Sequence, residues 1–546
     1  MTRGGPRARR PRTAAEVAAR LTWGVLPGPS VDAETAAALE RGLGGVVLFA
    51  HNVESAAQVR ALTAALRDRA RGPFRIAIDQ EGGHIVRLGA PLTRFPSAMA
   101  IGATGSARLA RAVARAQAEE LAALGIDVDL APVLDLAADP RNPTVGARSF
   151  GSVPNLVARL GAAAVGGFLE AGVAPVPKHF PGHGRTPLDS HRSRPYVTGG
   201  PDVLWEQDLL PFRSAVEAEA PAVMVGHVAY EGLTMGGPAS LSPAVMTTLL
   251  RGTLDFDGVV VTDALVMDAI TDERSVAEAC VEALAAGADA VMPLDPWRRA
   301  LVAVEEAIAA GRLAEPALAA SLRRLDTLER RLAASPALRP AGPLVPRADA
   351  HAALAGEVAR RSLSRLGGGL ALPIPPDTAV AVVEFGAGRP SPIESEDEPL
   401  ASLGAVLGER LPRLVSVVIE PEEGDGGAAE ARARELAAAA ELLVVATRDT
   451  FLRPRAADLL GDLRRLGRPT VHVALRSPYD LVALPVAGPD GLAVAAYADV
   501  PATLGAVADA LTGVPASGED RFPGRIPMAL PDRAEAPEEA ALDPGR

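Results

Sequence analysis

The sequence predicts an α/β fold in two parts, a (β/α)8 barrel of the TIM type followed by a smaller α/β sandwich domain. Between residues 15 and 300, a short apolar run, a loop rich in Gly, Pro, Asp or His, and commonly an Ala-, Leu- and Arg-rich helical pattern follow one another repeatedly. Hydrophobic strands that alternate with helices form a parallel sheet covered by helices, and eight such units suggest a closed barrel. The eight apolar runs begin near Leu21 (LTWGVL), Gly45 (GVVLF), Phe74 (FRIAID), Ile126 (IDVDLAP), Val173 (VAPVPKH), Ala222 (AVMVGH), Gly258 (GVVVTDA) and Ala288 (ADAVMP).

The pattern changes where the barrel ends. A helical pattern covers residues 315–333, and the Pro-rich stretch SPALRPAGPLVP follows at 335–346 without apolar periodicity. We therefore expect the barrel over residues 15–334, and a linker with a connecting helix (350–366) over residues 335–369.

Five further apolar runs predict the sandwich domain over residues 370–531. Ala- and Arg-rich helical patterns such as 428–440 separate some of these runs, as expected of an open α/β domain. The runs begin at Thr378 (TAVAVVEF), Leu414 (LVSVVIE), Leu442 (LLVVAT), Thr470 (TVHVAL) and Gly491 (GLAVAAY).

Both ends of the sequence have the composition of disordered tails, basic over residues 1–14 and acidic over residues 532–546. The pair Arg9 and Arg10 could belong to an export signal, but residues 13–20 mix polar and apolar side chains where such a signal needs an apolar segment. We therefore expect a cytoplasmic protein.

The overall composition excludes several classes of protein. The chain has 546 residues, of which 48% are hydrophobic, and this proportion argues against global disorder. Its net charge of −12 argues against a binder of nucleic acids or anionic membranes, because neutralising phosphates needs a basic surface. No uninterrupted apolar stretch reaches the ~18 residues of a transmembrane helix. The single cysteine, Cys280, permits no internal disulfide.

Polar residues gather just after the predicted barrel strands, where the active site of such a barrel lies. Six of the eight histidines are among them, and so is Lys178, the only lysine among 55 basic residues. Lysine and arginine are not interchangeable, so this position is a candidate for a specific role. The polar residues are His51, Asn52, Asp79, Gln80, Glu81, His84, Asp135, Lys178, His179, His183, Asp189, His191, His227 and Asp263.

Two of these groups suggest acid/base and nucleophilic chemistry. In the loop KHFPGHGRTPLDSH, Asp189 stands two residues before His191, and a carboxylate beside an imidazole makes a general acid/base that works near neutral pH. Asp263 ends the strand VVVTDA, from which its carboxylate can be aimed into the barrel mouth as a nucleophile. Together they resemble the arrangement of a retaining glycosidase. We expect Asp135, by contrast, to be a cap or turn residue.

These motifs carry a resemblance to a family. KHFPGHG with the following DSH, DQEGG at 79–83, GARSF at 146–150, PASLS at 238–242 and FDGVVVTDAL at 256–265 resemble the glycoside hydrolase family 3 β-N-acetylglucosaminidases of the NagZ type. The resemblance covers residues 20 to 330, and VALRSPYDL and GRIPMALP are similar to the sandwich of two-domain members.

The resemblance implies a role for each matching residue. It implies that Asp263 is the nucleophile that forms a covalent glycosyl-enzyme, and that His191 is the acid/base with Asp189 as its dyad partner. The residues that match sugar-binding positions are Asp79, Arg87, Arg148, Lys178 and His179. We expect Lys178 to act as a point-charge donor to a sugar hydroxyl, in a pocket that a guanidinium would overfill. His84 departs from the family, where Arg often follows DQEGG.

No metal or other cofactor is expected. His179, His183 and His191 could ligate a metal, but Pro181 and Gly182 remove the helical spacing that pairs such ligands, and the early His-x-His pair of metal-dependent barrels is absent.

The sequence therefore predicts a retaining exo-β-N-acetylglucosaminidase that acts on a small carbohydrate such as a cell-wall (muropeptide) or chitin fragment, with neither nucleic acid nor membrane as a partner. Two alternatives stay open. A β-N-acetylglucosaminide or β-glucoside phosphorylase could use the same dyad with phosphate as the acceptor, because a histidine repels that anion less than a carboxylate would. A catalytically inactive sugar-binding relative is the other. The oligomeric state is open too.

Overall fold

The structure is a computed structural model that describes residues 12–198, 200–294, 297–386, 402–420, 426–483, 490–513 and 520–530. Residues 1–11 of the predicted basic tail and the whole predicted acidic tail, residues 532–546, lie outside these ranges. Residues 13 and 14 belong instead to helix α1 (Ala14–Leu21), whose N-cap Thr13 exchanges hydrogen bonds with Glu16. The first described helix therefore includes residue 14, which the composition had placed in the basic tail.

All eight predicted barrel runs form parallel strands. Each strand is short and almost wholly buried, as expected for a sheet covered by helices. The strands are β1 (Trp23–Val25), β2 (Gly45–Leu48), β3 (Arg75–Ile78), β4 (Val128–Asp129), β5 (Ala174–Pro175), β7 (Ala222–Val225), β9 (Val259–Ala264) and β10 (Ala290–Met292).

These strands close into a ring. One sheet has the order β1-β2-β3-β4-β5 and a second has the order β10-β9-β7. A parallel bridge between Thr22 and Val291 joins β1 to β10, and another between Phe180 and Val225 joins the end of β5 to β7. The α/β barrel predicted from the sequence is therefore confirmed. A small parallel pair, β6 (Tyr196–Val197) and β8 (Ala229–Tyr230), lies outside the ring.

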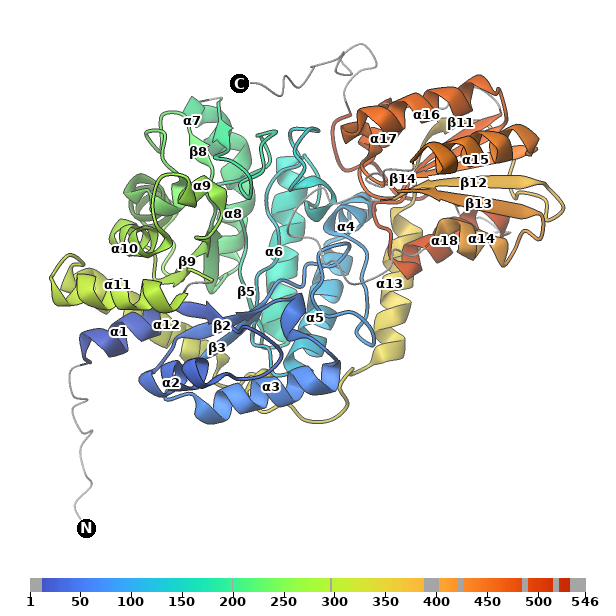
Figure 1. Ribbon diagram of the computed structural model, residues 1–546. Coiled ribbons are helices and arrows are strands. Elements are labelled where there is room, and N and C mark those ends of the chain that lie inside the picture. The colour runs from blue at the N-terminus through green and yellow to red at the C-terminus, as the bar shows by residue number, and fades with distance from the viewer. Residues whose placement is uncertain are drawn as a thin grey trace.

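Helices surround the barrel strands (Figure 1). Several begin at the capping residues that the sequence places there, such as Ser106 before α5 and Ser275 before α10. The helices are α2 (Ala33–Arg41), α3 (Ala56–Arg69), α4 (Ala98–Thr104), α5 (Ala107–Ala123), α6 (Pro154–Glu170), α7 (Gly200–Val203), α8 (Leu209–Glu217), α9 (Asp268–Thr271), α10 (Val276–Ala286), α11 (Trp297–Ala309) and α12 (Glu315–Leu332). Short 3-10 helices are η1 (Ala50–Asn52), η2 (Gly146–Arg148), η4 (Ala239–Leu241) and η6 (Pro336–Leu338), and π-helices are η3 (Leu204–Asp208) and η5 (Ala244–Thr253).

The second domain contains a six-stranded sheet of order β11-β16-β15-β14-β12-β13, parallel except for the edge strand β11. All five predicted runs are strands of this sheet. The strands are β11 (Ser364–Gly368), β12 (Val380–Phe385), β13 (Leu414–Ile419), β14 (Leu442–Thr447), β15 (Thr470–Ala474) and β16 (Gly491–Ala495). The helices are α14 (Leu403–Gly408), α15 (Gly426–Ala439), α16 (Pro454–Arg465), α17 (Tyr479–Ala483) and α18 (Pro501–Thr512), with the 3-10 helix η7 (Thr450–Leu452).

Strand β11 was not predicted. Residues 364–368 were expected within the linker and connecting helix, but helix α13 (Ala348–Ser362) ends earlier and the chain then pairs antiparallel with β16. The stretch SRLGG contains one large apolar residue, Leu366, so it lacks the apolar pattern that would predict a strand. It forms a strand because it pairs with β16 at the edge of the sheet. The second sheet therefore begins at Ser364 rather than after residue 369.

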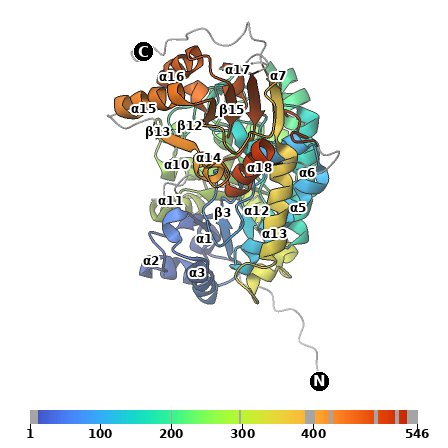
Figure 2. The same ribbon diagram turned by 90° about the vertical axis from the view of Figure 1, so that its right-hand side faces the viewer.

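The two domains share a continuous interface. Helix α13 packs against α4 and α5 of the barrel and against α18 of the second domain, and Figures 1 and 2 both show it running along the barrel toward that domain. The C-terminal segment returns to the barrel, where Ser152 N donates to Pro527 O at 3.1 Å. Tyr479 and Tyr497 of the second domain belong to the same buried hydrophobic cluster as the barrel core.

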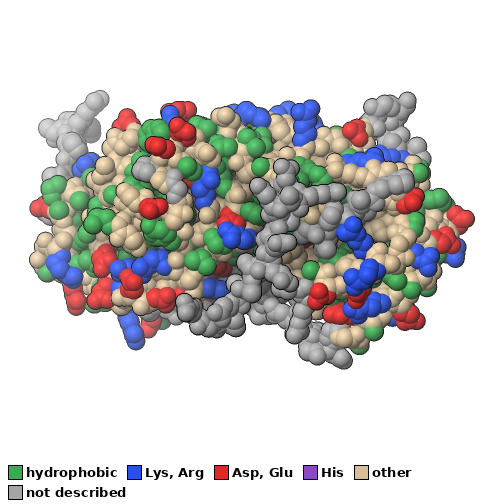
Figure 3. All heavy atoms as spheres, turned by 90° about the horizontal axis from the view of Figure 1, so that it is seen from above, with side chains coloured by type: hydrophobic (Ala, Val, Ile, Leu, Met, Phe, Trp, Pro, Cys, Tyr) green, Lys and Arg blue, Asp and Glu red, His purple; other side chains and the backbone are tan. Residues whose placement is uncertain are grey.

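In the parts of the chain that the structure describes, no helix is both long and apolar enough to cross a membrane. Seen from above, acidic and basic side chains are interspersed with apolar ones over the surface (Figure 3).

Candidate active site

A cavity of about 410 Å³ lies at the carboxyl ends of the barrel strands. Seven of the eight predicted site residues line it, and the eighth, Asp189, binds one that does. Phe49, Met267 and Met292 contribute apolar wall. The seven lining residues are Asp79, Arg87, Arg148, Lys178, His179, His191 and Asp263.

Asp263 presents its carboxylate from β9, the longest strand of the barrel. One carboxylate oxygen, Oδ1, accepts a hydrogen bond from the amide of Ala264 at 2.7 Å. Burial alone would raise the pKa of Asp263, but the nearby rings of His179 and His227 and the Ala264 amide outweigh it and hold the pKa well below its usual range. The carboxylate is therefore ionised at neutral pH, as a nucleophile must be.

His227 forms a hydrogen bond to the last residue of β9. Its Nε2 donates to the carbonyl of Ala264 at 2.9 Å, and its Nδ1 lies 2.7 Å from Ser240 Oγ. Because a carbonyl only accepts, Nε2 carries the proton; burial lowers the pKa of His227, so the ring is neutral and Nδ1 accepts from the serine hydroxyl. Ser240 belongs to the PASLS motif, which thus helps to position the strand that carries Asp263.

His191 is held by Asp189 through two hydrogen bonds to one oxygen. Asp189 Oδ1 accepts from His191 Nδ1 at 2.7 Å and from the His191 amide at 2.9 Å. Burial opposes ionisation of Asp189, but these hydrogen bonds outweigh it and lower its pKa to about 2. An ionised Asp189 can only accept, so Nδ1 keeps its proton and Nε2 is the ring nitrogen left for chemistry in the cavity.

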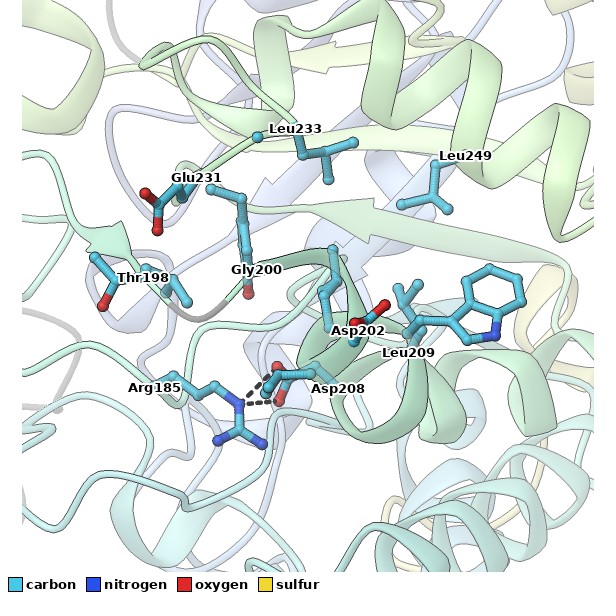
Figure 4. Close-up of a pocket in the computed structure, with 15 residues that line it drawn as sticks. Arg185, Thr198, Gly200, Asp202, Asp208, Leu209, Glu231, Leu233 and Leu249 are labelled. Carbon is cyan, nitrogen blue, oxygen red and sulfur yellow. Dashed lines mark hydrogen bonds and ion pairs between the residues drawn. The ribbon is translucent and has the colours of Figure 1, made fainter.

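The loop that carries this dyad is fixed to the barrel at several points. Asn142 Nδ2 donates to the carbonyls of His183 and Thr186, both at 2.8 Å. Arg185 Nε donates to Asp208 at 2.7 and 3.0 Å, and Figure 4 shows this pair at the wall of a second cavity of about 280 Å³. Because these contacts come from different elements, residues outside the loop help to fix its conformation.

Lys178 binds two carboxylates in the cavity wall. Its Nζ lies 2.6 Å from Asp79 Oδ1 and 2.7 Å from Glu81 Oε1. Burial would lower the pKa of Lys178, but the two carboxylates raise it, so the lysine is charged. A third ammonium proton is left to donate toward the cavity. The peptide bond between Lys178 and His179 is cis.

Glu81 was noted at the strand end but given no role from the sequence. Its side chain is 5% exposed and pairs with Arg148 Nε and Nη2 at 2.8 and 2.7 Å, as well as with Lys178. Burial would raise the pKa of Glu81, but the two cations hold it well below its usual range. Glu81 therefore fixes two predicted sugar-binding cations in one cluster.

The expectation that Asp135 is a cap or turn residue is wrong. Its carboxylate is fully buried and accepts from His179 Nδ1 at 2.6 Å, from the His179 amide at 3.2 Å and from the His183 amide at 2.7 Å. These three donors lie more than forty residues further along the chain. Asp135 thus orients the His179 ring, and no local sequence pattern could have shown this.

The described residues contain no group of three or more His, Cys, Asp or Glu side chains arranged to hold a metal ion.

Comparisons with known proteins agree on one family. The model of the glycosyl hydrolase family 3 N-terminal domain matches residues 23–328. Beta-hexosaminidase A of Pseudoalteromonas piscicida is 38% identical over 325 residues, which are 54% of this chain and 54% of that protein, so the chain spans about half the length of this relative. Beta-hexosaminidase LpqI of Mycobacterium tuberculosis is 39% identical over 266 residues, which are 47% of this chain and 68% of that protein.

A solved structure covers both domains. It is that of a glycoside hydrolase family 3 β-N-acetylglucosaminidase from Paenibacillus sp. str. FPU-7, with a TM-score of 0.87 and 33% sequence identity, over 95% of this chain and 99% of that one. The likeness therefore includes the second domain as well as the barrel.

Proposed function

Because the chain belongs to glycoside hydrolase family 3, we propose that it is a retaining exo-β-N-acetylglucosaminidase, which releases N-acetylglucosamine from β-glycosides such as cell-wall (muropeptide) or chitin fragments. One observation carries the proposal. An ionised carboxylate, Asp263, and an imidazole held by an ionised aspartate, His191 with Asp189, belong to one cavity at the barrel mouth. The relatives named β-hexosaminidase and β-N-acetylglucosaminidase support the sugar specificity.

In the first step, a carboxylate oxygen of Asp263 attacks the anomeric carbon, and the bond to the leaving oxygen breaks. The imidazolium of His191 gives the proton on Nε2 to that oxygen, so the aglycone leaves as a neutral alcohol. The product is a covalent glycosyl-enzyme with inverted configuration at the anomeric carbon.

In the second step, the neutral His191 ring accepts a proton from water through Nε2, and the water oxygen displaces Asp263 with a second inversion. The Asp189 carboxylate keeps the Nδ1 proton in place throughout, so the same nitrogen serves first as acid and then as base.

The cluster around Lys178 would hold the sugar ring. Asp79 is its most exposed carboxylate, with 17% of the side chain accessible, and is placed to accept from ring hydroxyls. Lys178 and Arg148 would donate to sugar oxygens with the protons that Asp79 and Glu81 leave unused. His179, which follows Lys178 in the chain and is oriented by Asp135, would also contact the sugar.

Product analysis tests the proposal. Wild-type protein is incubated with an aryl N-acetyl-β-glucosaminide, with and without inorganic phosphate, next to Asp263→Ala. We expect release of N-acetylglucosamine by the wild type, no stimulation by phosphate, and loss of turnover in the variant.

Other outcomes would replace the proposal. Formation of the α-sugar-1-phosphate with a large rate increase would identify a phosphorylase. Binding of N-acetylglucosamine without turnover would identify an inactive sugar-binding relative. Full activity in Asp263→Ala would remove Asp263 as the nucleophile.

The proposal includes the cytoplasmic location expected from the sequence. Fractionation of the cells in which the protein naturally occurs would test it, and recovery with the membrane or the medium would contradict it.

A further inference from the structure

The turn after β3 connects the sugar-binding cluster to the second domain. Glu81 N donates to Ile85 O at 3.0 Å, and Ile85 N donates to Gly82 O at 3.2 Å, which closes a tight turn from Glu81 to Ile85. Gly82 and Gly83 have φ values of 88° and 59°, in the left-handed region that favours glycine. His84, the residue that departs from the family pattern, lies in this turn, three residues from Glu81.

His84 faces the second domain. It lines a small cavity of about 20 Å³ together with Asp449, Ser477 and Tyr479, all of which belong to that domain. The charged groups that act on its ring come from both sides of the interface: Arg476 and Asp499 from the second domain, and Arg148 and Glu81 from the barrel. Burial and the neighbouring Arg476 lower the pKa of His84 to about 3, so its ring is neutral.

Arg476 and Asp499 belong to a buried ionic cluster at the carboxyl ends of the second sheet. Arg476 Nε donates to Asp499 Oδ2 at 3.0 Å, and Arg448 Nε lies 3.3 Å from the same oxygen. Arg448 Nη2 lies 3.5 Å from Glu384 Oε2, and all four side chains are 1–2% exposed. Ligands of open α/β sheets bind at this edge. Here a loop of the barrel occupies it.

A second contact joins the same turn to the second domain. Ser97 Oγ donates to the carbonyl of Tyr497 at 2.6 Å. A Cβ added to Gly83 would lie 2.8 Å from Ser97 Cβ, so the turn packs directly on this serine. Gly83 N donates to Phe95 O at 2.9 Å, which fixes the turn to the segment that carries Ser97.

We propose that the second domain positions the sugar-binding cluster of the active site, and that the Arg476–Asp499 pair acts on Glu81 through His84. Glu81 holds both Lys178 and Arg148, so a shift of the turn moves the two cations together. His84 is a positioning residue in this account, because it lies in the turn and does not line the active-site cavity.

Kinetics of His84→Ala and His84→Gln test the inference, with the assay resting on the proposed function. Because misplacing a binding group by even 1 Å can be costly, we expect His84→Ala to lower kcat/KM about tenfold, mainly through KM. His84→Gln keeps a donor and an acceptor and should recover most of the loss. Leu452→Ala is the matched control, because Leu452 lines the same small cavity from the second domain without a charge.

A purely structural role would give a different result. His84→Ala would then lower the unfolding temperature like Leu452→Ala and leave KM unchanged, and this outcome would overturn the inference. The double variant His84→Ala/Arg476→Lys gives a second check. If the two residues act in series, kcat/KM of the double variant should fall no further than in the more impaired single variant. Fully additive losses would contradict coupling through Arg476.

Hydrogen exchange separates this inference from the proposed function. Amide exchange over residues 81–87 should accelerate in His84→Ala relative to both wild type and Leu452→Ala, whatever substrate the enzyme uses. A wild type without turnover on the aryl substrate, combined with this acceleration, would refute the proposed function alone. Unchanged exchange over residues 81–87 would refute the positioning role.

Discussion

Two sets of parallel strands in this molecule end in charged residues, and they differ in what those residues face. At the barrel mouth, Asp263 and His191 line a cavity of about 410 Å³. At the corresponding edge of the second sheet, Arg476 and Asp499 pair with each other, and both side chains are only 2% exposed. Charged residues follow the strands in both domains, but only those at the barrel mouth line a cavity large enough for a substrate.

The difference has an energetic consequence. A charge that faces an open cavity can be removed with less effect on folding, whereas removal of one partner of a buried pair leaves an uncompensated charge. Substitutions at the barrel mouth should therefore lower mainly activity, and substitutions at the second edge should lower mainly stability.

After Asp263→Ala, the largest effect is expected at His191. His191→Ala removes the group that protonates the leaving oxygen, and should lower kcat about 10³-fold on a substrate whose leaving group is a sugar. An activated aryl leaving group needs less protonation, so its cleavage should suffer less. The measurement is a comparison of kcat for the two substrates, with far-UV circular dichroism as the folding control. An equal loss on both substrates would contradict the acid role.

Asp499→Ala should lower stability much more than activity. It leaves Arg448 and Arg476 buried without their shared carboxylate, and should lower the free energy of unfolding by about 3 kcal/mol. Denaturant unfolding measures this loss, and kcat at 25 °C in the folded fraction should fall far less than in His191→Ala. A stable Asp499→Ala protein would show that the cluster is not held by this pair.

The dyad carries a pH-dependent contribution to stability. The pKa of Asp189 falls from an ordinary 3.8 to about 2 on folding, so its contribution is present above pH ~4 and is lost as the pH falls toward ~2. The shift corresponds to about 2 kcal/mol. The free energy of unfolding is measured for wild type and Asp189→Asn at a series of pH values from 5 downward. The difference between the two proteins should shrink by that amount. Parallel curves would mean that His191 does not stabilise the ionised Asp189.

The smallest effect is expected at the only lysine. Lys178→Arg keeps the charge but replaces an ammonium that lies 2.6 and 2.7 Å from two carboxylates with a larger planar group, and should lower kcat/KM about tenfold. The exposed Arg141, which pairs with the nearby Asp139, offers a control in Arg141→Lys. Unchanged kcat/KM in Lys178→Arg would mean that the lysine is merely tolerated.

The sequence predicted the barrel well because each strand is buried on both faces and is therefore an apolar run, and its motifs marked the residues around the cavity. Strand β11 was missed because it pairs with an existing edge and needs no apolar run. Asp135 and Glu81 were visible as polar residues at strand ends, but their partners, His179 and Arg148, lie 44 and 67 residues away. Such roles follow from the closure of the barrel, which a local pattern does not contain.

The most direct test of Asp263 as the nucleophile is to trap the glycosyl-enzyme. The protein is incubated with a slow fluorinated N-acetylglucosaminyl substrate, digested, and mapped by mass spectrometry. We expect one sugar adduct, on the peptide that contains Asp263, and no adduct in Asp263→Ala. An adduct on another carboxylate such as Asp79 or Glu81, or turnover without any adduct, would contradict it.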